Sequence, residues 1–408
     1  MMFTEATLPD QLQANAGDPL RILIVGAGIG GTTAAQLLRT RGLHPVLIDR
    51  VSSFDDAGYM LALMPMVDAA IDALGVRDAY VEASTPVDRY RVLNHHGAQI
   101  REDSLGELLR DYGDYRGISR GALLDVLTEA GAPVTVGTTV RSLNDGDASA
   151  HVRFDTPDGA AEATFDAVII ADGIHSHTRR FTPGGTGLNE TITGWGGWVV
   201  WADADDDIDL GEEMWGDGFF VGSYPVAGAI GAFIGGPGGD TAVGPQAFVD
   251  SIRAHLTSRT SRLDHVLDSV SAADEPFYWV LDDVRTQQWA SGRTVLLGDA
   301  AAGFLPTAGI GAGMAIESAW VLCGTIADAT SASVRVALSA YEAEQRPRVE
   351  SAQANSRQLA GLMFRRSTLL AHARNLAMRM MTIEAALGPI KKLLQKPARI
   401  PEVTEAVD

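Results

Sequence analysis

A glycine-rich turn near the start of the chain, set between a strand-like and a helix-like segment, limits the fold more than any other feature. Residues 20–25 are apolar and branched, which predicts a buried parallel strand. The turn at 26–31 reads GAGIGG and fits the spacing G-x-G-x-x-G, and residues 32–41 predict a helix. A second predicted strand, 44–49, ends on an aspartate. Together these segments predict a right-handed βαβ unit that opens an α/β domain.

The glycines of this turn have separate physical roles in holding a dinucleotide. Gly26 permits the tight turn, Gly28 lets the backbone approach a pyrophosphate, and Gly31 lets the helix pack closely on the sheet. The helix N-terminus offers free N–H groups and a partial positive charge to the phosphates. The aspartate is expected to bind the adenosine ribose, so the predicted contacts are Gly26, Gly28, Gly30, Gly31, Asp49 and Arg50. The turn alone does not distinguish NAD from FAD.

The length of 408 residues predicts more than one lobe, and the later segments differ in character. Residues 191–233 are rich in Trp, Phe and Gly and predict an antiparallel sheet with one covered face. In it, Trp198 and Val200 are expected to face one side, and Val199 and Trp201 the other. Further helices are predicted at 60–83, 121–130, 312–327 and beyond 335, and further strands at 134–140, 151–154, 165–170 and 294–297.

Composition excludes several classes of function. The net charge of −20 argues against nucleic-acid binding, and the single cysteine excludes an intrachain disulfide and favours a cytoplasmic protein. The first 19 residues do not resemble a secretory signal, and no uncharged apolar run of 18 residues predicts a transmembrane helix. The three lysines all lie in 391–396, which excludes Walker-type phosphate loops and most Schiff-base chemistry.

Three local patterns each have two interpretations. The acidic segment 203–213 could be a calcium loop, but Ile208 and Met214 stand where such a loop needs Gly and Glu, so a solvated loop is favoured. Residues 357–399 hold six arginines and three lysines against one glutamate. A tail docked on the acidic body is favoured there over a membrane-binding helix. The adjacent His95 and His96 lack a third ligand at a metal-binding spacing, so no metal site is predicted.

Two later motifs resemble those of flavin-dependent aromatic hydroxylases. In ADGIHSHTR, residues 171–179, the family's Asp-Gly, Ser and Arg are all matched. In LGDAA, residues 297–301, which continues as FLPTAGIGAG at 304–313, the family's Gly-Asp motif is matched. With the first turn, these motifs resemble the para-hydroxybenzoate hydroxylase-like, or group A, FAD monooxygenases from about residue 20 to about 350. The chain departs from the family at Ala302, Gly313 and Ser318, where His, Asn and Asp are frequent.

The resemblance implies an α/β fold of three parts. A Rossmann-like FAD-binding domain is expected from residues 20–85, 105–185 and 285–335. An inserted, mostly antiparallel β-sheet domain for the substrate is expected from 86–104 and 186–284. A helical C-terminal region is expected at 336–408.

The resemblance also implies a cofactor site. Asp299 is expected to bind the ribityl hydroxyls, and the N–H groups at 311–313 are expected to stabilise negative charge at the flavin N1–C2=O edge. Arg120 is expected to lie along the cofactor, the alternative being a surface arginine at a helix start. Pro306 is expected to shape the wall beside the ring. The residues implied in cofactor binding are Arg120, Asp172, Arg179, Asp299, Pro306, Gly311, Ala312 and Gly313.

The implied reaction is a monooxygenation. NADPH or NADH reduces FAD, oxygen adds at flavin C4a, and the hydroperoxide transfers one oxygen atom to an aromatic or other apolar small molecule, most simply as a hydroxylation. Epoxidation or Baeyer–Villiger outcomes, the substrate and the oligomeric state are left open. Candidates for the substrate cavity, each alternatively ordinary core, are Trp198, Trp201, Met214, Phe220, Tyr224, Phe233 and Pro306, with Tyr224 as a polar contact.

Three other functions compete with this one. A flavin-dependent halogenase needs a lysine and a Trp-x-Trp-x-Ile-Pro segment that this chain lacks. A plain NAD(P) dehydrogenase is disfavoured by the motif at Asp299. A flavin-binding protein without turnover, which holds a reactive intermediate, is the main alternative.

Overall fold

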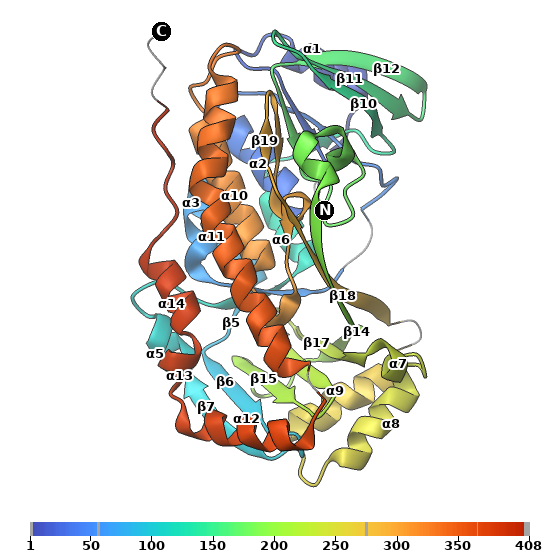
Figure 1. Cartoon of the computed structure of the whole chain (residues 1–408), viewed down its shortest axis with the longest axis vertical. Coiled ribbons are helices and arrows are strands. Elements are labelled where there is room, and N and C mark those ends of the chain that lie inside the picture. Colours follow the sequence, from blue (N-terminus) through green and yellow to red (C-terminus); the bar gives the residue numbers. More distant parts are fainter. Residues whose placement is uncertain (1–2, 55–57, 274–275, 365, 404–408) are drawn as a thin grey trace.

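Two sheets with helices packed against them form the body of the protein, and the long helix α11 (Val334–Met363) runs past both (Figure 1). The computed structural model describes residues 3–54, 58–273, 276–364 and 366–403. No helix among these residues is both long enough and apolar enough to cross a membrane.

The first sheet is the predicted parallel sheet. Its strand order is β19-β20-β13-β2-β3, and only the short β19 runs antiparallel to its neighbour. The four parallel strands are buried throughout because helices cover the sheet, so their apolar runs do not alternate with polar residues. The bounds are β2 (Ile22–Val25), β3 (Val46–Ile48), β13 (Ala167–Ile170), β19 (Ala290–Ser291) and β20 (Thr294–Leu296).

The second sheet has eight strands in the order β21-β18-β14-β17-β16-β15-β6-β7. Its pairs are antiparallel except β15 with β6, which confirms the mostly antiparallel sheet predicted from sequence. The bounds are β6 (Arg89–Leu93), β7 (Gln99–Ser104), β14 (Leu188–Asp203), β15 (Leu210–Trp215), β16 (Phe220–Val226), β17 (Ala229–Pro237), β18 (Phe277–Thr286) and β21 (Ala302–Gly303).

One face of this second sheet packs against α8 (Pro245–His255) and α9 (Ser261–Ala272). Trp198 and Val200 lie in the core between the sheet and these helices, as the predicted alternation requires. Trp201 lies on the opposite face, where it approaches Gly231 of the neighbouring strand.

Three small sheets complete the strands, and two predictions fail among them. Residues 60–63, predicted as helix, form a strand that pairs with residues 116–119, because a short apolar run fits either structure until its partner is known. The predicted strand 134–140 is interrupted at 135–138, between two strands of different sheets. The bounds are β1 (Phe3–Glu5), β4 (Met60–Leu63), β5 (Thr85–Pro86), β8 (Arg116–Ser119), β9 (Ala132–Val134), β10 (Thr139–Asp145), β11 (Ala150–Thr156) and β12 (Gly159–Phe165).

The helices of the first lobe centre on α2 (Ile29–Arg39) and α10 (Gly311–Thr325), which pack on each other (Figure 1). Both begin next to a glycine-rich turn. The remaining helices, of which α7 and α12 pack on the second sheet, are α1 (Leu8–Asn15), α3 (Asp68–Leu74), α4 (Arg77–Ala83), α5 (Leu105–Leu109), α6 (Arg120–Leu127), α7 (Gly238–Thr241), α12 (Thr368–Met380), α13 (Ile383–Ala386) and α14 (Gly388–Gln395).

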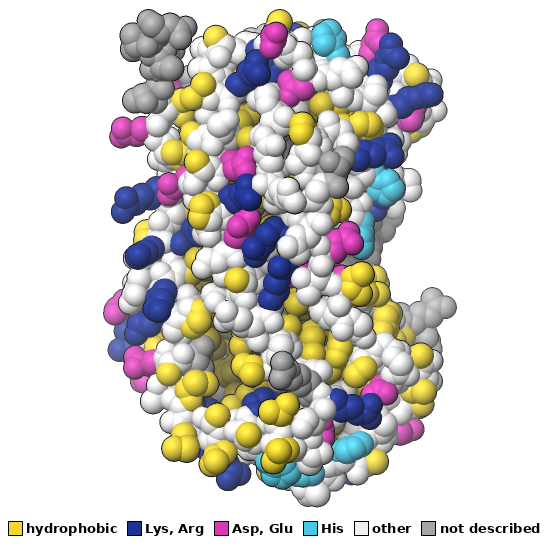
Figure 2. All heavy atoms as spheres, viewed as in Figure 1, with side chains coloured by type: hydrophobic (Ala, Val, Ile, Leu, Met, Phe, Trp, Pro, Cys, Tyr) yellow, Lys and Arg dark blue, Asp and Glu magenta, His cyan; other side chains and the backbone are white. Residues whose placement is uncertain are grey.

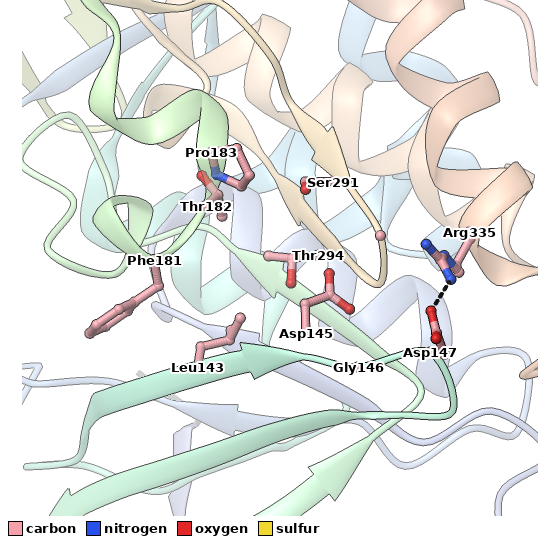
Figure 3. Close-up of a pocket in the computed structure, with 11 residues that line it drawn as sticks. Leu143, Asp145, Gly146, Asp147, Phe181, Thr182, Pro183, Ser291, Thr294 and Arg335 are labelled. Carbon is pink, nitrogen blue, oxygen red and sulfur yellow. Dashed lines mark hydrogen bonds and ion pairs between the residues drawn. The ribbon is translucent and has the colours of Figure 1, made fainter.

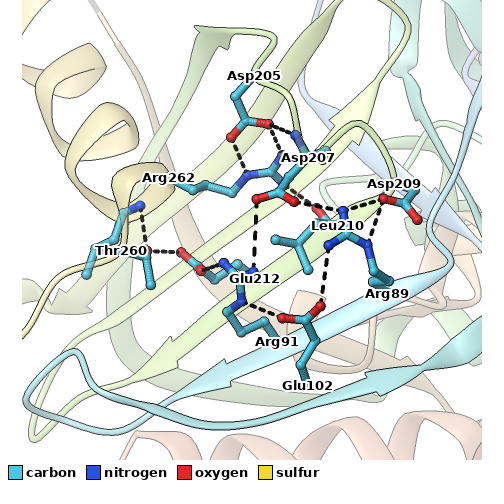
Figure 4. A network of polar contacts seen from close by, with 11 residues as sticks. Arg89, Arg91, Glu102, Asp205, Asp207, Asp209, Leu210, Glu212, Thr260 and Arg262 are labelled. Atoms are coloured by element: carbon cyan, nitrogen blue, oxygen red, sulfur yellow. Dashed lines mark hydrogen bonds and ion pairs between the residues drawn. The ribbon is translucent and has the colours of Figure 1, made fainter.

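The acidic segment 203–213 is exposed at residues 203, 204, 206 and 208, as predicted for a solvated loop, but several of its carboxylates are paired. Asp205, Asp207, Asp209 and Glu212 are held by arginines from two other elements, β6 and α9 (Figure 4). Arg262, which is 1% exposed, forms an ion pair with Asp205, and Arg89 pairs with Asp207 and Asp209 at 2.8 and 2.6 Å. The segment is therefore a charge-paired connection that fastens α9 to the second sheet.

The basic C-terminal segment docks on the acidic body, which is the favoured prediction. Arg357 donates hydrogen bonds of 2.8 and 2.7 Å to the fully buried Asp283, and Arg366 forms an ion pair with Asp240 at 2.9 Å. Figure 2 shows hydrophobic side chains at the lower end of the molecule, where α12 lies in the same view. Contact of this end with a membrane stays the disfavoured alternative.

Candidate functional site: a cofactor groove beside an aromatic sheet

The glycine-rich turn joins β2 to α2 and leaves room on one side only. A Cβ atom on Gly26, whose φ is +103°, would lie 2.5 Å from the carbonyl oxygen of Ala171, and one on Gly31 would lie 1.9 Å from that of Gly26. Only glycine fits at these two positions. A Cβ on Gly28 would meet nothing within 4 Å, whereas one on Gly30 would touch side chains at 3.7 Å. The open side at Gly28 is where a phosphate can approach the backbone.

Asp49 follows β3 and braces this turn. Its Oδ2 accepts a hydrogen bond of 2.7 Å from the N–H of Ala27, and its Oδ1 accepts one of 3.0 Å from the N–H of Val51. A carboxylate has about four acceptor sites, so both oxygens keep capacity for ribose hydroxyls. Arg50 lies beside it with its side chain exposed.

Asp172 follows β13 and carries an unsatisfied oxygen. Its Oδ2 accepts a hydrogen bond of 3.1 Å from the N–H of Thr178. Its Oδ1 is buried and has no hydrogen-bond partner among the described residues. Because a buried acceptor without a partner is costly, this atom indicates a ligand that donates to it.

Arg179 of the same motif joins two loops and does not reach into the groove. Its buried guanidinium donates hydrogen bonds of 2.8 Å to the carbonyl of Ala300 and 2.7 Å to the carbonyl of Ile174. These bonds fasten the loop after β13 to the loop after β20. We therefore assign Arg179 a positioning role, which corrects the expectation of direct cofactor contact.

Asp299 follows β20 and has no cationic partner among the described residues. Surrounding protein atoms desolvate its carboxyl group and raise the pKa to about 6, although the residue as a whole is exposed to solvent. It thus lines an open groove. Burial raises the pKa of Tyr59, Asp299 raises it further and Arg120 opposes this, so both charged groups lie near the Tyr59 hydroxyl. This places Arg120 beside the groove.

The loop from Pro306 to Gly311 leads into the N-terminus of α10. No side chain caps this helix at Ile310, so its first N–H groups are free to stabilise negative charge. Pro306 begins a short 3₁₀ turn, and its side chain is half-buried. Packing also favours glycine at position 313, because a Cβ atom there would lie 3.1 Å from the Met66 sulfur.

These loops converge because of the strand order. β20, β13, β2 and β3 are parallel neighbours, so the residues after their carboxyl ends meet along one edge of the sheet, where α/β folds bind ligands. The open side of Gly28, the unsatisfied Oδ1 of Asp172, the carboxylate of Asp299 and the uncapped α10 together fit one elongated cofactor with phosphates, hydroxyls and a ring that becomes negatively charged. FAD has these groups in this order.

The second sheet turns an aromatic face toward this groove. The ring centroids of Tyr59 and Trp279 lie 5.0 Å apart, those of Trp279 and Phe233 lie 6.4 Å apart, and those of Phe233 and Phe220 lie 6.2 Å apart. Since Tyr59 senses the charge of Asp299, this chain of rings leads from the groove across the sheet. Trp279 lies outside residues 191–233, the part of this sheet for which cavity residues were predicted.

Two candidate cavity residues lie on the wrong face. Trp198 and Met214 are packed in the core against α8 and α9, with the sheet between them and the aromatic face. They are ordinary core residues, because the period of two along a strand places alternate side chains on opposite faces. Trp201 lies on the aromatic side but is partly exposed, and Tyr224 lies there in buried surroundings.

Glu213 is a buried carboxylate on this aromatic face that the sequence analysis placed in an acidic loop. Its Oε2 accepts a hydrogen bond of 2.7 Å from the indole N–H of Trp215, and its Oε1 accepts one from the hydroxyl of Tyr224. Tyr90 is hydrogen-bonded to it as well, and burial followed by the charge of Glu213 raises the pKa of Tyr90 well above its ordinary value. The alternation of strand β15, with Met214 facing the other side, is the signal that could have found it.

A separate surface cavity of about 310 Å³ lies away from this edge (Figure 3). Its lining includes Gly292 and Thr294, at the amino end of β20, and Asp147, which pairs with Arg335 at 3.2 Å. Because the cofactor edge is at the carboxyl end of the same strand, this cavity is not the cofactor site.

The fold and the groove define a flavoprotein with an aromatic sheet beside its cofactor, and the comparisons agree. Residues 20–356 match the family described as FAD binding domain, and the chain belongs to this family. A 3-amino-4-hydroxybenzoate 2-monooxygenase of Streptomyces cremeus is 30% identical over 84% of this chain and 87% of its own length. An aurachin C monooxygenase/isomerase of Stigmatella aurantiaca is 27% identical over 92% of this chain and 98% of its own.

A solved structure has the same fold. HpxO of Klebsiella pneumoniae, complexed with FAD and uric acid, matches with a TM-score of 0.82 and 22% identity over 92% of this chain and 97% of its own. With these relatives, the chain is a FAD-dependent monooxygenase and hence an oxidoreductase.

Proposed function

We propose that the protein hydroxylates an aromatic small molecule whose ring carries an ionisable O–H or N–H group, using O₂ and either NADPH or NADH. The observation that carries this proposal is the Glu213 carboxylate, which is buried in an aromatic sheet face and hydrogen-bonded to Tyr224 and Trp215. A buried carboxylate without a cation is expensive, so its position beside an apolar wall argues for a chemical task. The relatives named for 3-amino-4-hydroxybenzoate and uric acid act on or bind rings with such groups, which supports the same class here.

The cofactor is held along the carboxyl edge of the parallel sheet. Gly28 and the start of α2 would take the pyrophosphate, Asp49 the adenosine ribose, and Asp172 and Asp299 further donors along the cofactor. Bound FAD supplies the redox chemistry: it accepts a hydride from NAD(P)H and activates O₂. The free N–H groups of α10 would stabilise negative charge on the ring.

The residues of the second sheet would prepare the substrate. Phe220, Phe233 and Trp279 would exclude water and hold the ring flat. Tyr224 would accept the substrate's hydroxyl proton while its own proton passes to Glu213, because its hydroxyl already donates to this carboxylate. Loss of this proton makes the ring more electron-rich, which favours attack by an electrophilic oxygen atom. In this proposal the segments 86–104 and 186–284 serve the substrate and the remaining lobe serves the cofactor.

The experiment combines a substrate screen with one substitution. The holoenzyme is mixed with hydroxylated aromatic and N-heteroaromatic acids, and stimulated NAD(P)H oxidation, O₂ uptake and the gain of one oxygen atom in the product are measured. Glu213→Gln is expected to keep its FAD and to lower kcat about 100-fold near neutral pH. Glu162→Gln, at a site exposed on β12, is the matched control and is expected to change nothing.

Two outcomes would contradict the proposal. If no compound stimulates NAD(P)H oxidation although FAD is bound, a flavin-binding protein without turnover is the better description. If Glu213→Gln turns over a hydroxylated ring at the wild-type rate, the carboxylate has no part in the reaction.

A further inference from the structure

Three histidines that are far apart in the chain meet at the lower end of the second sheet. His95 and His96 lie in the hairpin between β6 and β7, and His372 lies on α12. One ring nitrogen from each lies within 4.8 Å of one from each of the others. The ring centroids of His95 and His96 are 4.0 Å apart, and those of His95 and His372 are 4.7 Å apart. The cluster belongs to no part of the cofactor groove or the aromatic face.

In two of these rings a backbone carbonyl fixes the position of the proton. Nδ1 of His96 lies 3.1 Å from the carbonyl oxygen of His255, and Nδ1 of His372 lies 2.7 Å from that of Thr368. A carbonyl only accepts hydrogen bonds, so each neutral ring must carry its proton on Nδ1. Nε2 then presents a lone pair, which is the arrangement of most metal-binding histidines.

The third ring has a buried nitrogen with nothing to bind. His95 is 5% exposed, and its Nε2 has no hydrogen-bond partner among the described residues. Its Nδ1 lies 2.6 Å from the side-chain amide nitrogen of Asn375, whose Oδ1 is likewise buried and unsatisfied. Rotating the side-chain amide of Asn375 by half a turn exchanges its nitrogen and its oxygen. Nδ1–H of His95 then donates to Oδ1 of Asn375, which satisfies that oxygen and leaves a lone pair on Nε2 of His95.

A guanidinium and a carboxylate lie within electrostatic reach of the cluster. The carboxylate is that of Asp217, and it would stabilise a cation held by the three rings. The guanidinium of Arg374 is engaged elsewhere: it donates to the carbonyls of Trp215 and Gly216 and lies over the Trp215 ring.

We propose that His95, His96 and His372 bind one divalent transition-metal ion of the zinc class, which fastens α12 to the β6–β7 hairpin. Three imidazoles without a thiolate suit Zn²⁺, Co²⁺ or Ni²⁺ and not Ca²⁺ or Mg²⁺, which prefer oxygen ligands. In a tetrahedral zinc site with bonds of about 2.0–2.1 Å, the nitrogens lie about 3.4 Å apart, so the rings need to close by no more than about 1.5 Å. A water molecule or a carboxylate completes the fourth position.

The test uses untagged, FAD-loaded protein that has been stripped with a chelator and dialysed. Zn²⁺ is titrated by calorimetry, and Co²⁺ is added separately to record the visible absorption of a tetrahedral site. Wild type is expected to bind one Zn²⁺ per chain and to gain in Tm. His96→Ala and His372→Ala are expected to weaken binding by at least about 100-fold, and Asn375→Leu, which removes the orienting contact, by about 10- to 100-fold.

The control is His151→Ala, an exposed histidine on β11 of a different sheet, which is expected to bind Zn²⁺ as wild type does. Equal Tm values of all variants without metal show that they are folded. The proposal is overturned if the stripped wild type binds no Zn²⁺ at millimolar concentration, or if His372→Ala binds it with unchanged affinity and stoichiometry. None of these readouts depends on the reaction that the flavin supports.

Discussion

Asp299 is the residue whose chemistry differs most between the free protein and the cofactor complex. Without a cation beside it, burial raises the pKa of its carboxyl group to about 6. A hydroxyl that donates to the ionised carboxylate would favour the charged form and lower this pKa. FAD binding should therefore weaken as the pH falls through 6, and the free protein should be more stable when Asp299 is protonated.

Asp299→Asn tests this at the level of one residue. The folded apoprotein binds more protons than the unfolded chain between about pH 4 and 6, so its stability falls as the pH rises through this window. The side-chain amide of the variant does not ionise, so the variant avoids the free-energy cost of a desolvated negative charge. The Tm of the variant apoprotein should equal that of wild type near pH 4 and exceed it above pH 6, while the variant's FAD affinity should be lower.

Thermal unfolding of both apoproteins from pH 4 to pH 8 measures the difference. Asp158→Asn, in the exposed turn between β11 and β12, serves as a control and should show no pH-dependent difference from wild type. A Tm difference for Asp299→Asn that is the same at every pH would show that the pKa of the Asp299 carboxyl group is not raised in the folded protein.

At the scale of elements, charge pairing holds the second sheet to its helices. Arg262 of α9 is almost fully buried, and it donates to Asp205 and to main-chain carbonyls of residues 207 and 210. Removing one partner of a buried pair leaves the other charge uncompensated. The whole connection 203–210 depends on this one side chain, together with Arg89.

Arg262→Met is expected to lower the free energy of unfolding by about 3–5 kcal/mol, because Asp205 loses its buried partner. Arg141→Met breaks an ion pair with Asp155 in which both side chains are exposed, and it should cost less than about 1 kcal/mol. Denaturant unfolding of the holoenzyme gives both values. Equal losses for the two variants would mean that the loop is held by its backbone and not by the buried arginine.

Strands and helices that have a local sequence pattern could be predicted from the sequence alone. The strands at 22–25, 46–48, 167–170 and 294–296 and the helices beside the glycine turns have buried, continuous apolar runs, which need no partner to be recognised. The helix predicted at 60–63 is wrong because a four-residue apolar run fits a helix and a strand equally well, and only its pairing with β8 decides between them.

Contacts between segments that are far apart in the chain could not be predicted from local sequence patterns. Met214 was placed in the cavity and Glu213 in a solvated loop because the start of β15, which decides the face of each, depends on its pairing with β6 and β16. Arg179 was assigned to the cofactor because nothing in its motif reveals the carbonyl of Ala300. The meeting of His95 with His372 likewise requires the docking of α12.

For the whole molecule, the arrangement of two sheets around one groove is the basis of the function. The parallel sheet supplies the loops that end at Gly28, Asp172 and Asp299, and the second sheet supplies a water-excluding aromatic face beside them. Helix α11 fixes one lobe against the other through Gln353, which donates to the carbonyls of Val284 and Gly303.

The most direct test of this account is a titration of the stripped wild type and of Asp172→Ala and Asp299→Ala with FAD, followed by flavin fluorescence and absorbance. We expect one FAD per wild-type chain, a yellow complex, and clearly weaker binding by both variants, which should remain folded by circular dichroism. A wild type that binds no FAD, or two variants that bind it as tightly as wild type, would show that these loops do not hold the cofactor.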